Sequence, residues 1–187
     1  GHLIVDLHQA AGLAVARVED AVVHSRLAAV ACLPADDVAI ETLRGVGVGL
    51  PGPVEFATGR PVTPPIMPGW HLYPVGQRLA ERFGVLALVD NDVNIMAVGE
   101  HWSRWRDEAF LMFVKVGTGI GCGLVAGGHV HRGSDGAAGD IGHIHVPDQD
   151  DVVCRCGNLG CLEAVAGGSA LAARLAELGL PTRTSRD

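Results

Sequence analysis

Several features common in other proteins are scarce or missing in this sequence of 187 residues. No apolar run reaches the roughly 18 residues that a membrane-spanning helix needs, so a transmembrane protein is excluded. No five like charges follow one another and the net charge is −7, so the basic surface of a nucleic-acid-binding domain is missing. Charged residues make up only 19% against 48% hydrophobic residues, which excludes general disorder.

The sequence also lacks the pattern of a secretory signal, because no basic segment followed by an apolar segment opens it. It contains five cysteines, an odd number that does not suit a framework of disulfides. Both observations favour a reducing, cytoplasmic setting. Three of the five cysteines lie within residues 154–161, which points to a metal site.

Short apolar runs alternate with helical patterns along the chain. Strands are expected at residues 3–7, 46–50, 85–89, 110–116 and 143–146, with a meander at 13–18 and 21–23 and a hairpin of 124–126 with 129–131. Helices are expected at residues 34–44, 74–83, 93–105 and 170–178, and a short helical piece at 137–141. Residues 55–70 and the glycine-rich segment 117–123 are expected to be loops.

This alternation predicts an α/β fold with a mixed sheet. Residues 85–89 are continuously apolar, which is typical of a strand buried on both faces. A break near Asp107 predicts two lobes, residues 1–107 and 108–187, both incomplete. We expect the chain to be a fragment, because the last helix has no strand to return to.

The most specific signal is a set of four possible metal ligands: His143, Cys154, Cys156 and Cys161. Three thiolates and one imidazole form a closed tetrahedral set for a structural zinc ion. The glycines between the last two cysteines allow a turn that brings Cys161 back to the same centre. His145 is a competing imidazole, since it would share the strand face of His143. The alternative interpretation is three reduced thiols without metal.

Polar residues follow the expected strand 85–89. Asp90, Asn91, Asp92 and Asn94 lie where a buried strand ends and a helix begins, and ligands bind at such strand ends in open α/β sheets. A carboxylate here can accept a proton from a substrate hydroxyl. The alternative is that these residues only cap the helix.

The glycine-rich segment 117–123 also follows a strand. Its backbone N–H groups are suited to bind phosphate, although a glycine hairpin without a ligand is equally compatible with the pattern. Asp140 precedes His143 and Glu163 follows the last cysteine. A metal ion that folds this region would make Asp140, His143 and Glu163 neighbours.

Five segments together resemble the ROK family (repressor, open reading frame, kinase): residues 49–53, 91–94, 117–121, 138–143 and 154–163. The resemblance implies an actin-like, ribonuclease-H-like fold of two α/β lobes with a sugar in the cleft between them. Kinases of the family transfer the γ-phosphate of ATP, with Mg²⁺, to a hexose hydroxyl.

The resemblance also implies roles for individual residues. Asp92 corresponds to the catalytic base of the kinases. Residues that correspond to ligands of the sugar hydroxyls are Asn91, Asp92, Asp140, His143 and Glu163. Gly117, Thr118 and Gly119 correspond to a phosphate-binding loop. His143 would then bind zinc through one ring nitrogen and offer the other to the sugar.

Two departures from the family pattern bear on activity. The kinases open with a loop of the Asp-x-Gly-Gly-Thr type, whereas residues 6–11 here read Asp-Leu-His-Gln-Ala-Ala, without glycine. The close approach of backbone to phosphate is therefore impaired. Asp140 stands where the family usually has Glu, and its shorter side chain weakens a hydrogen bond to a sugar hydroxyl.

We therefore expect the sugar-binding domain of a ROK-type transcriptional regulator with structural zinc and without kinase activity. An ATP-dependent sugar kinase, such as a glucokinase or an N-acetyl-amino-sugar kinase, is the alternative. A homo-oligomer, in the simplest case a dimer, is expected, as is DNA binding only through an N-terminal helix-turn-helix that these residues do not contain. The span from Val23 to Leu43 looks short for the first lobe of the family.

Overall fold

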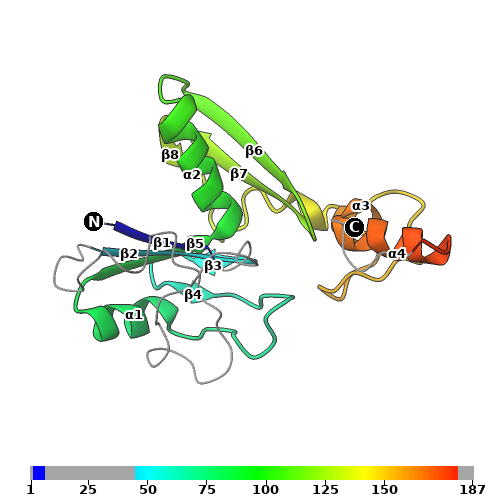
Figure 1. The fold of residues 1–187 in the computed structure, drawn as a ribbon, viewed down its shortest axis with the longest axis horizontal. Coiled ribbons are helices and arrows are strands. Elements are labelled where there is room, and N and C mark those ends of the chain that lie inside the picture. Colours follow the sequence, from blue (N-terminus) through cyan, green and yellow to red (C-terminus); the bar gives the residue numbers. More distant parts are fainter. Residues whose placement is uncertain (1, 7–44, 181–187) are drawn as a thin grey trace. The chain divides into compact units, whose positions relative to one another are not determined.

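The computed structural model describes residues 2–6 and 45–180, and of residues 2–6 only the backbone (Figure 1). The elements expected at residues 13–18, 21–23 and 34–44 lie outside these ranges. The chain divides into two compact units, Gly1–Ile95 and Met96–Asp187. The lobe boundary at residue 107 stays a prediction. Among the described residues, no helix is long and apolar enough to cross a membrane.

A parallel sheet organises the first unit. Its strands lie in the order β1 (His2–Asp6), β2 (Gly45–Leu50) and β5 (Leu86–Asn91), as the apolar runs predict. Helix α1 (Val75–Phe83) runs along one face of this sheet and ends at Gly84 (Figure 1). Most of the buried core lies between this helix and the strands: Val46, Val48, Leu50, Val75, Leu79 and Val89.

The register aligns the carboxyl ends of the three strands. Gly49 lies opposite Asp6 on one side and Asp90 on the other. Polar residues that follow the strands are therefore collected at one edge of the sheet. Nearby, β3 (Val54–Glu55) and β4 (Arg60–Pro61) form a short antiparallel pair inside the segment expected to be only loop.

The expectation that residues 85–89 are buried on both faces is wrong. Leu86 is 67% exposed and Leu88 47% exposed, whereas Val89 is fully buried. Only the carboxyl end of β5 has the burial of an internal strand, because the strand alternates up to that point between a covered and an open face. The polar residues that follow are thus attached to the most deeply buried part of β5.

The second unit is built on an antiparallel sheet. After α2 (Asp92–Arg104), which begins in the first unit, the chain forms β6 (Phe110–Val116), β7 (Ile120–Ala126) and β8 (His129–Val130). Gly127 and Gly128 connect β7 and β8 with φ of 57° and 80°, as a two-residue hairpin turn requires. The strands of the described residues form separate parallel and antiparallel sheets. The expected mixed sheet stays a prediction, because the meander expected at residues 13–18 and 21–23 lies outside these residues.

The glycine loop is shorter than expected. β7 begins at Ile120 and pairs with β6 up to Val116, so residues 120–123 belong to a strand. Only residues 117–119 remain as the connection, which we call the glycine turn. The alternation along β6 leaves Phe110, Met112, Val114 and Val116 exposed on one face.

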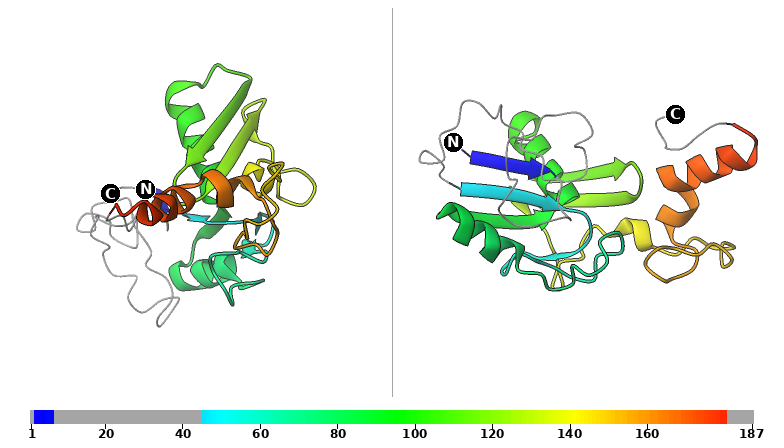
Figure 2. Two further views of the ribbon diagram at one scale, coloured as in Figure 1. Left: turned by 90° about the vertical axis from the view of Figure 1, so that its right-hand side faces the viewer. Right: turned by 60° about the horizontal axis from the view of Figure 1, so that its bottom comes forward.

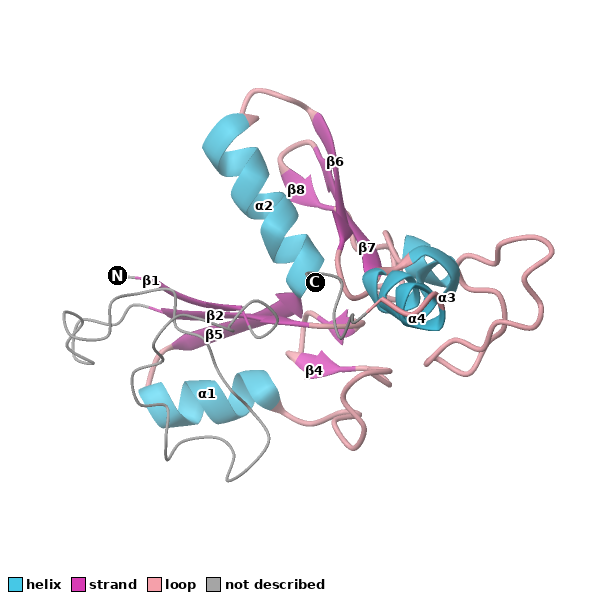
Figure 3. Ribbon diagram, turned by 45° about the vertical axis from the view of Figure 1, so that its right-hand side comes forward, coloured by secondary structure: helices cyan, strands magenta, loops and turns pink. Residues whose placement is uncertain are grey.

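A long irregular segment follows β8. It contains the short 3₁₀ helix η2 (Ile141–His143) and ends at α3 (Leu162–Ala166) and α4 (Gly168–Glu177) (Figures 2 and 3). The expected strand at 143–146 is wrong, because His143 closes η2 and only His145 forms an isolated bridge, to Cys161. The expected helix at 170–178 is confirmed as α4, whereas the five-residue α3 was not expected.

Candidate functional site

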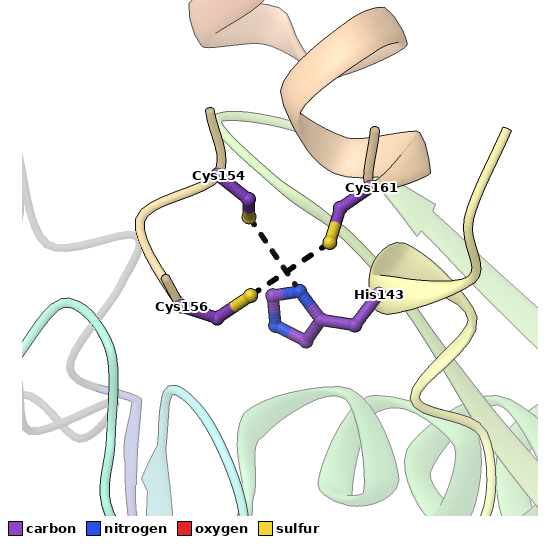
Figure 4. Close-up of side chains that lie close together, drawn as sticks. All are labelled: His143, Cys154, Cys156 and Cys161. Atoms are coloured by element: carbon purple, nitrogen blue, oxygen red, sulfur yellow. Dashed lines mark hydrogen bonds between the residues drawn. The ribbon is translucent and has the colours of Figure 1, made fainter. Parts of the chain in front are cut away.

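The four candidate metal ligands converge in the second unit. Figure 4 shows His143 at the end of η2, Cys154 and Cys156 on the irregular segment, and Cys161 just before α3. One ligand atom from each residue lies within 4.8 Å of all the others. Local hydrogen bonds build the loop, since the N–H of Cys154 donates to Asn158 and the N–H of Gly157 donates back to Cys154.

The spacing of these atoms fits a tetrahedral metal ion. The Sγ atoms of Cys156 and Cys161 lie 3.7 Å apart, and Cys154 Sγ lies 3.7 Å from His143 Nδ1. Zinc–sulfur bonds of about 2.3 Å place two thiolates on tetrahedral corners roughly 3.8 Å apart. A disulfide needs about 2.05 Å, so the pair is not bonded. All four cysteines among the described residues are free thiols. The cluster can therefore hold a metal ion.

Burial controls the protonation of the thiols. It raises the pKa of Cys161 to about 12 and also raises the pKa of Cys154. Burial acts on Cys156 as well, but hydrogen bonds from the Asn158 backbone and from the two other thiols outweigh it and lower its pKa. The pKa is thus raised for two of the three thiols. A cation is required to hold all three thiolates together.

The competing imidazole lies outside the cluster. His145 Nε2 lies 2.8 Å from Asp150 Oδ1, and its ring packs beside Gly160. The chain direction changes at the end of η2, so the two histidines do not share a strand face. His143 instead directs Nδ1 toward Cys154 and places Nε2 3.9 Å from Asp140 Oδ1. Asp140 and His143 are thus neighbours, as the sequence predicts for a folded loop.

The polar edge of the first unit is a compact network. Asn91 caps α2, because its Oδ1 accepts the N–H groups of Val93 at 2.9 Å and Asn94 at 3.2 Å. Asn91 Nδ2 donates to the Gly52 carbonyl at 3.0 Å. Asp92 is 5% exposed, and its Oδ1 also accepts the N–H of Val93. Capping is therefore carried mainly by Asn91.

Two further residues hold this edge in place. Asp90 Oδ1 accepts the N–H of Asn91 at 2.8 Å and the side-chain amide of Asn94 at 3.0 Å. Asp90 and Asn94 are 6% and 3% exposed, so these bonds form away from water, where they are strongest. The sequence analysis considered both residues only as ligand-binding residues or helix caps and did not predict the bond between them. The signal that could have indicated this bond is the spacing, because Asp90 and Asn94 are four residues apart across the start of a helix.

The other candidate residues lie in the second unit. Glu163, in the first turn of α3, uses Oε2 to accept the N–H of Ile120 at 3.1 Å, next to the glycine turn. The carbonyls of Gly117 and Thr118 accept N–H groups from the start of α4. The structure thus brings Glu163 together with residues 117–119, and Asp140 with His143. Asn91 and Asp92 belong to the other unit.

Comparisons with known proteins agree with these features. A model of the ROK family matches residues 20–185. A putative xylose repressor of Caldicellulosiruptor sp. is 43% identical over 128 residues, which are 68% of this chain and 32% of the relative. A glucokinase of Halalkalibacterium halodurans is 40% identical over 131 residues, 70% of this chain and 39% of the relative.

Solved structures give the same assignment. A ROK hexokinase from Thermus thermophilus matches with a TM-score of 0.61 and 34% identity, over 74% of this chain and 46% of that one. A ROK glucokinase from Streptomyces griseus, solved with glucose and AMPPNP, matches with a TM-score of 0.63 and 31% identity. The match covers 70% of this chain and 42% of the glucokinase.

The chain therefore belongs to the ROK family. It has the actin-like α/β fold of the ROK sugar kinases that it resembles. It spans about a third of the length of the curated relatives that it matches.

Proposed function

We propose that this chain is part of a ROK-family transcriptional regulator and contains most of its sugar-binding residues. The observation that carries the sugar-binding part is Asp92, a buried carboxylate at the carboxyl edge of the parallel sheet, held by a network that does not depend on it for capping. A carboxylate in this position can accept hydrogen bonds from two adjacent sugar hydroxyls. Asn91 retains one amide hydrogen beyond the bond to Gly52 for the same ligand.

The remaining candidate ligands in this proposal follow from the family resemblance and belong to the second unit: Asp140, His143 and Glu163. His143 binds a structural zinc ion through Nδ1, together with Cys154, Cys156 and Cys161, and Nε2 is then free to contact the sugar. Two donor distances of 3.7 Å support zinc, because they match the edges of a tetrahedron around that ion. The ion would hold the irregular segment in one shape and would thereby orient the imidazole.

The choice of regulator over kinase rests on the sequence after β1. Residues 6–11 contain no glycine, whereas the kinases of the family bind phosphate with a glycine-containing loop there. A regulator needs only to bind the sugar and to change its conformational equilibrium, which a DNA-binding segment elsewhere in the protein then reports. We place the full protein in the cytoplasm as a dimer, with its lobes divided near residue 107.

The alternative function is an ATP-dependent sugar kinase, which would use ATP and Mg²⁺. Two observations favour it: the glucokinases among the relatives, and the burial of Asp92, which suits a general base for a sugar hydroxyl. The Gly117–Gly119 turn would contact the nucleotide phosphates in that case.

The test uses the full-length protein and three sugars, xylose, glucose and N-acetylglucosamine. Calorimetric titration measures binding, and a coupled assay with ATP measures phosphoryl transfer. Binding of one sugar without transfer supports the regulator. Turnover on the order of 1 per second or faster supports the kinase instead. No binding of any of the three sugars, with metal present, contradicts this assignment of the sugar-binding residues.

A further inference from the structure

The carboxylate of Glu163 connects two parts of the second unit that are 43 residues apart in sequence. Its Oε2 accepts the N–H of Ile120 at 3.1 Å. Ile120 is the first residue of β7 and follows the glycine turn directly. An exposed glutamate in the first turn of a helix ordinarily interacts with the N–H groups of its own helix. Glu163 instead fixes the backbone of a different element.

The surrounding glycines show how closely these elements pack. A Cβ atom on Gly119 would overlap the carboxylate of Glu163. A Cβ atom on Gly142 would overlap the carbonyl oxygen of Ile120 and would also lie 3.4 Å from Glu163 Cβ. Glu163 therefore packs between the glycine turn and η2, and neither Gly119 nor Gly142 has room for a side chain.

The metal cluster is attached to the same two elements. Cys161 lies two residues before Glu163 at the position that precedes α3, while His143 follows Gly142 at the end of η2. The N–H of Leu162 donates to the carbonyl of Ile144 at 2.9 Å, which joins the start of α3 to the end of η2. A metal ion bound by Cys161 and His143 would thus hold both elements that enclose Glu163.

The glycine turn is closed by the N–H of Gly117, which donates to the Gly119 carbonyl at 2.9 Å, and it is also held from outside. Its carbonyls at Gly117 and Thr118 accept the N–H groups of Gly168 and Ser169, at 2.7 and 3.1 Å. These donors begin α4, which follows α3 after Gly167. The turn is therefore held both by the β6–β7 pairing and from outside by α4, which is connected to α3. α3 has only five residues, too few to be stable alone.

We propose that Glu163 is a positioning residue through which the metal cluster sets the backbone conformation of the glycine turn. The metal fixes the start of α3, and the hydrogen bond from Ile120 transmits that position to residues 117–119. This inference rests on the metal site of the proposed function. It adds that the metal shapes a turn which itself contains no metal ligand.

Amide hydrogen exchange in the full-length protein tests this coupling at single residues. The amide of Ile120 reports the Glu163 bond. The amide of Gly127, which donates to Ala109 at the other end of the β6–β7 hairpin, is the reference for general unfolding. Glu163→Ala removes the acceptor, whereas Glu163→Gln retains an acceptor oxygen. The matched control is Glu177→Ala, since Glu177 only pairs with Arg174 on the exposed side of α4.

In the zinc-loaded protein, Glu163→Ala should speed exchange at Ile120 by about tenfold or more, with Gly127 and the zinc content unchanged. Glu163→Gln should restore most of the protection, and Glu177→Ala should change nothing. Removal of zinc from the wild type should also speed exchange at Ile120, and this effect should be absent in Glu163→Ala.

Equal exchange at Ile120 in the wild type and in Glu163→Ala would overturn the proposal. So would equal exchange at Ile120 in the wild type with and without zinc. The zinc content of each sample is measured separately, so a failure of the metal site is distinguished from a failure of the coupling. Equal acceleration at Ile120 and Gly127 would mean that zinc stabilises the unit as a whole, and it also counts against the proposal.

Discussion

Asn91 and Asp92 are adjacent at the start of α2, and the side chain of either residue could cap the helix or bind a ligand. Asn91 Oδ1 accepts two backbone N–H groups of the first helical turn, and Asp92 Oδ1 accepts one of the same groups. The N–H of Val93 therefore retains an acceptor if Asp92 changes. This redundancy is the reason that a substitution at Asp92 separates ligand binding from helix stability.

For Asp92→Asn we expect a tenfold to hundredfold loss of sugar affinity, about 1.5–3 kcal/mol, with an unchanged thermal midpoint. Asparagine caps nearly as well as aspartate, but its amide cannot accept from two hydroxyls as a charged carboxylate does. Calorimetric titration of full-length wild type and variant with the three sugars measures the difference. Equal affinities would remove Asp92 from the site.

Asp90 and Asn94 should depend on each other. Asn94→Asp places two buried carboxylates where one donor–acceptor pair exists, so we expect a loss of stability of about 1–3 kcal/mol or more. The double variant Asp90→Asn with Asn94→Asp restores a donor opposite an acceptor and should recover part of the lost stability. Denaturant unfolding of the single and double variants measures the coupling. If the effects of the two single substitutions on stability simply add in the double variant, the predicted coupling between Asp90 and Asn94 is contradicted.

At the scale of elements, the sequence predicts those parts whose pattern is local. β2, β6, α1 and α4 follow from apolar periodicity within each segment, and the turn between β7 and β8 follows from paired glycines. The four residues of the cluster that could hold a metal ion were likewise predicted from spacing and residue type. The elements that were predicted wrongly or not predicted at all depend on contacts between segments that are distant in sequence.

The segment 143–146 illustrates this limit. Its apolar and histidine alternation favours a strand, but Gly142 packs against the Ile120 carbonyl and the chain ends a 3₁₀ turn at His143 instead. The five-residue α3 is too short for a periodic signal. The bond from Ile120 to Glu163 spans 43 positions and has no local signature. Packing decided these features.

Two glycines provide a matched test of this packing. Gly142→Ala puts a methyl group against the Ile120 carbonyl, so we expect a destabilisation of about 1–3 kcal/mol. Gly99 lies inside α2 with nothing within 4 Å of a Cβ atom. Gly99→Ala should therefore stabilise the protein by about 0.5–1 kcal/mol. Thermal unfolding of both variants gives the comparison, and a neutral Gly142→Ala would refute the close contact.

At the scale of the whole molecule, the two units depend on different sources of stability. The first unit has the clustered core of β2, β5 and α1. In the second unit, the segment from η2 to α3 contains little regular structure and its best-buried side chains include Cys154 and Cys161. A metal ion would stabilise this segment in the way that a core stabilises a larger domain.

Purified full-length protein should therefore contain about one equivalent of zinc per chain, and its removal should unfold the segment 143–161. Binding should weaken as the pH falls, because three thiols must lose protons and burial raises the pKa of Cys154 and Cys161. Metal analysis and chelator competition at pH 8, 7 and 6 (roughly, spanning the range where metal and protons compete) measure both effects. A folded segment with less than about half an equivalent of metal would contradict this prediction.

Transfer of phosphate from ATP requires all the groups that surround the nucleotide phosphates. Phosphoryl transfer depends almost entirely on positioning and on charge stabilisation around the phosphates, which needs backbone N–H groups on both sides of the nucleotide. We propose the glycine turn for one side only in the kinase alternative, and residues 6–11 contain no glycine for the other. Full-length protein should therefore transfer no phosphate from ATP to xylose, glucose or N-acetylglucosamine at typical enzyme rates, on the order of 1 per second.

The control for this assay is a measurement of sugar binding on the same sample, because a misfolded protein is inactive for a trivial reason. A protein that binds a sugar and lacks turnover fits a regulator, in which Asp92 holds the ligand without acting as a base. Turnover that disappears in Asp92→Asn would instead show that the residues after β1 still bind phosphate without glycine, and the kinase would then be the correct assignment.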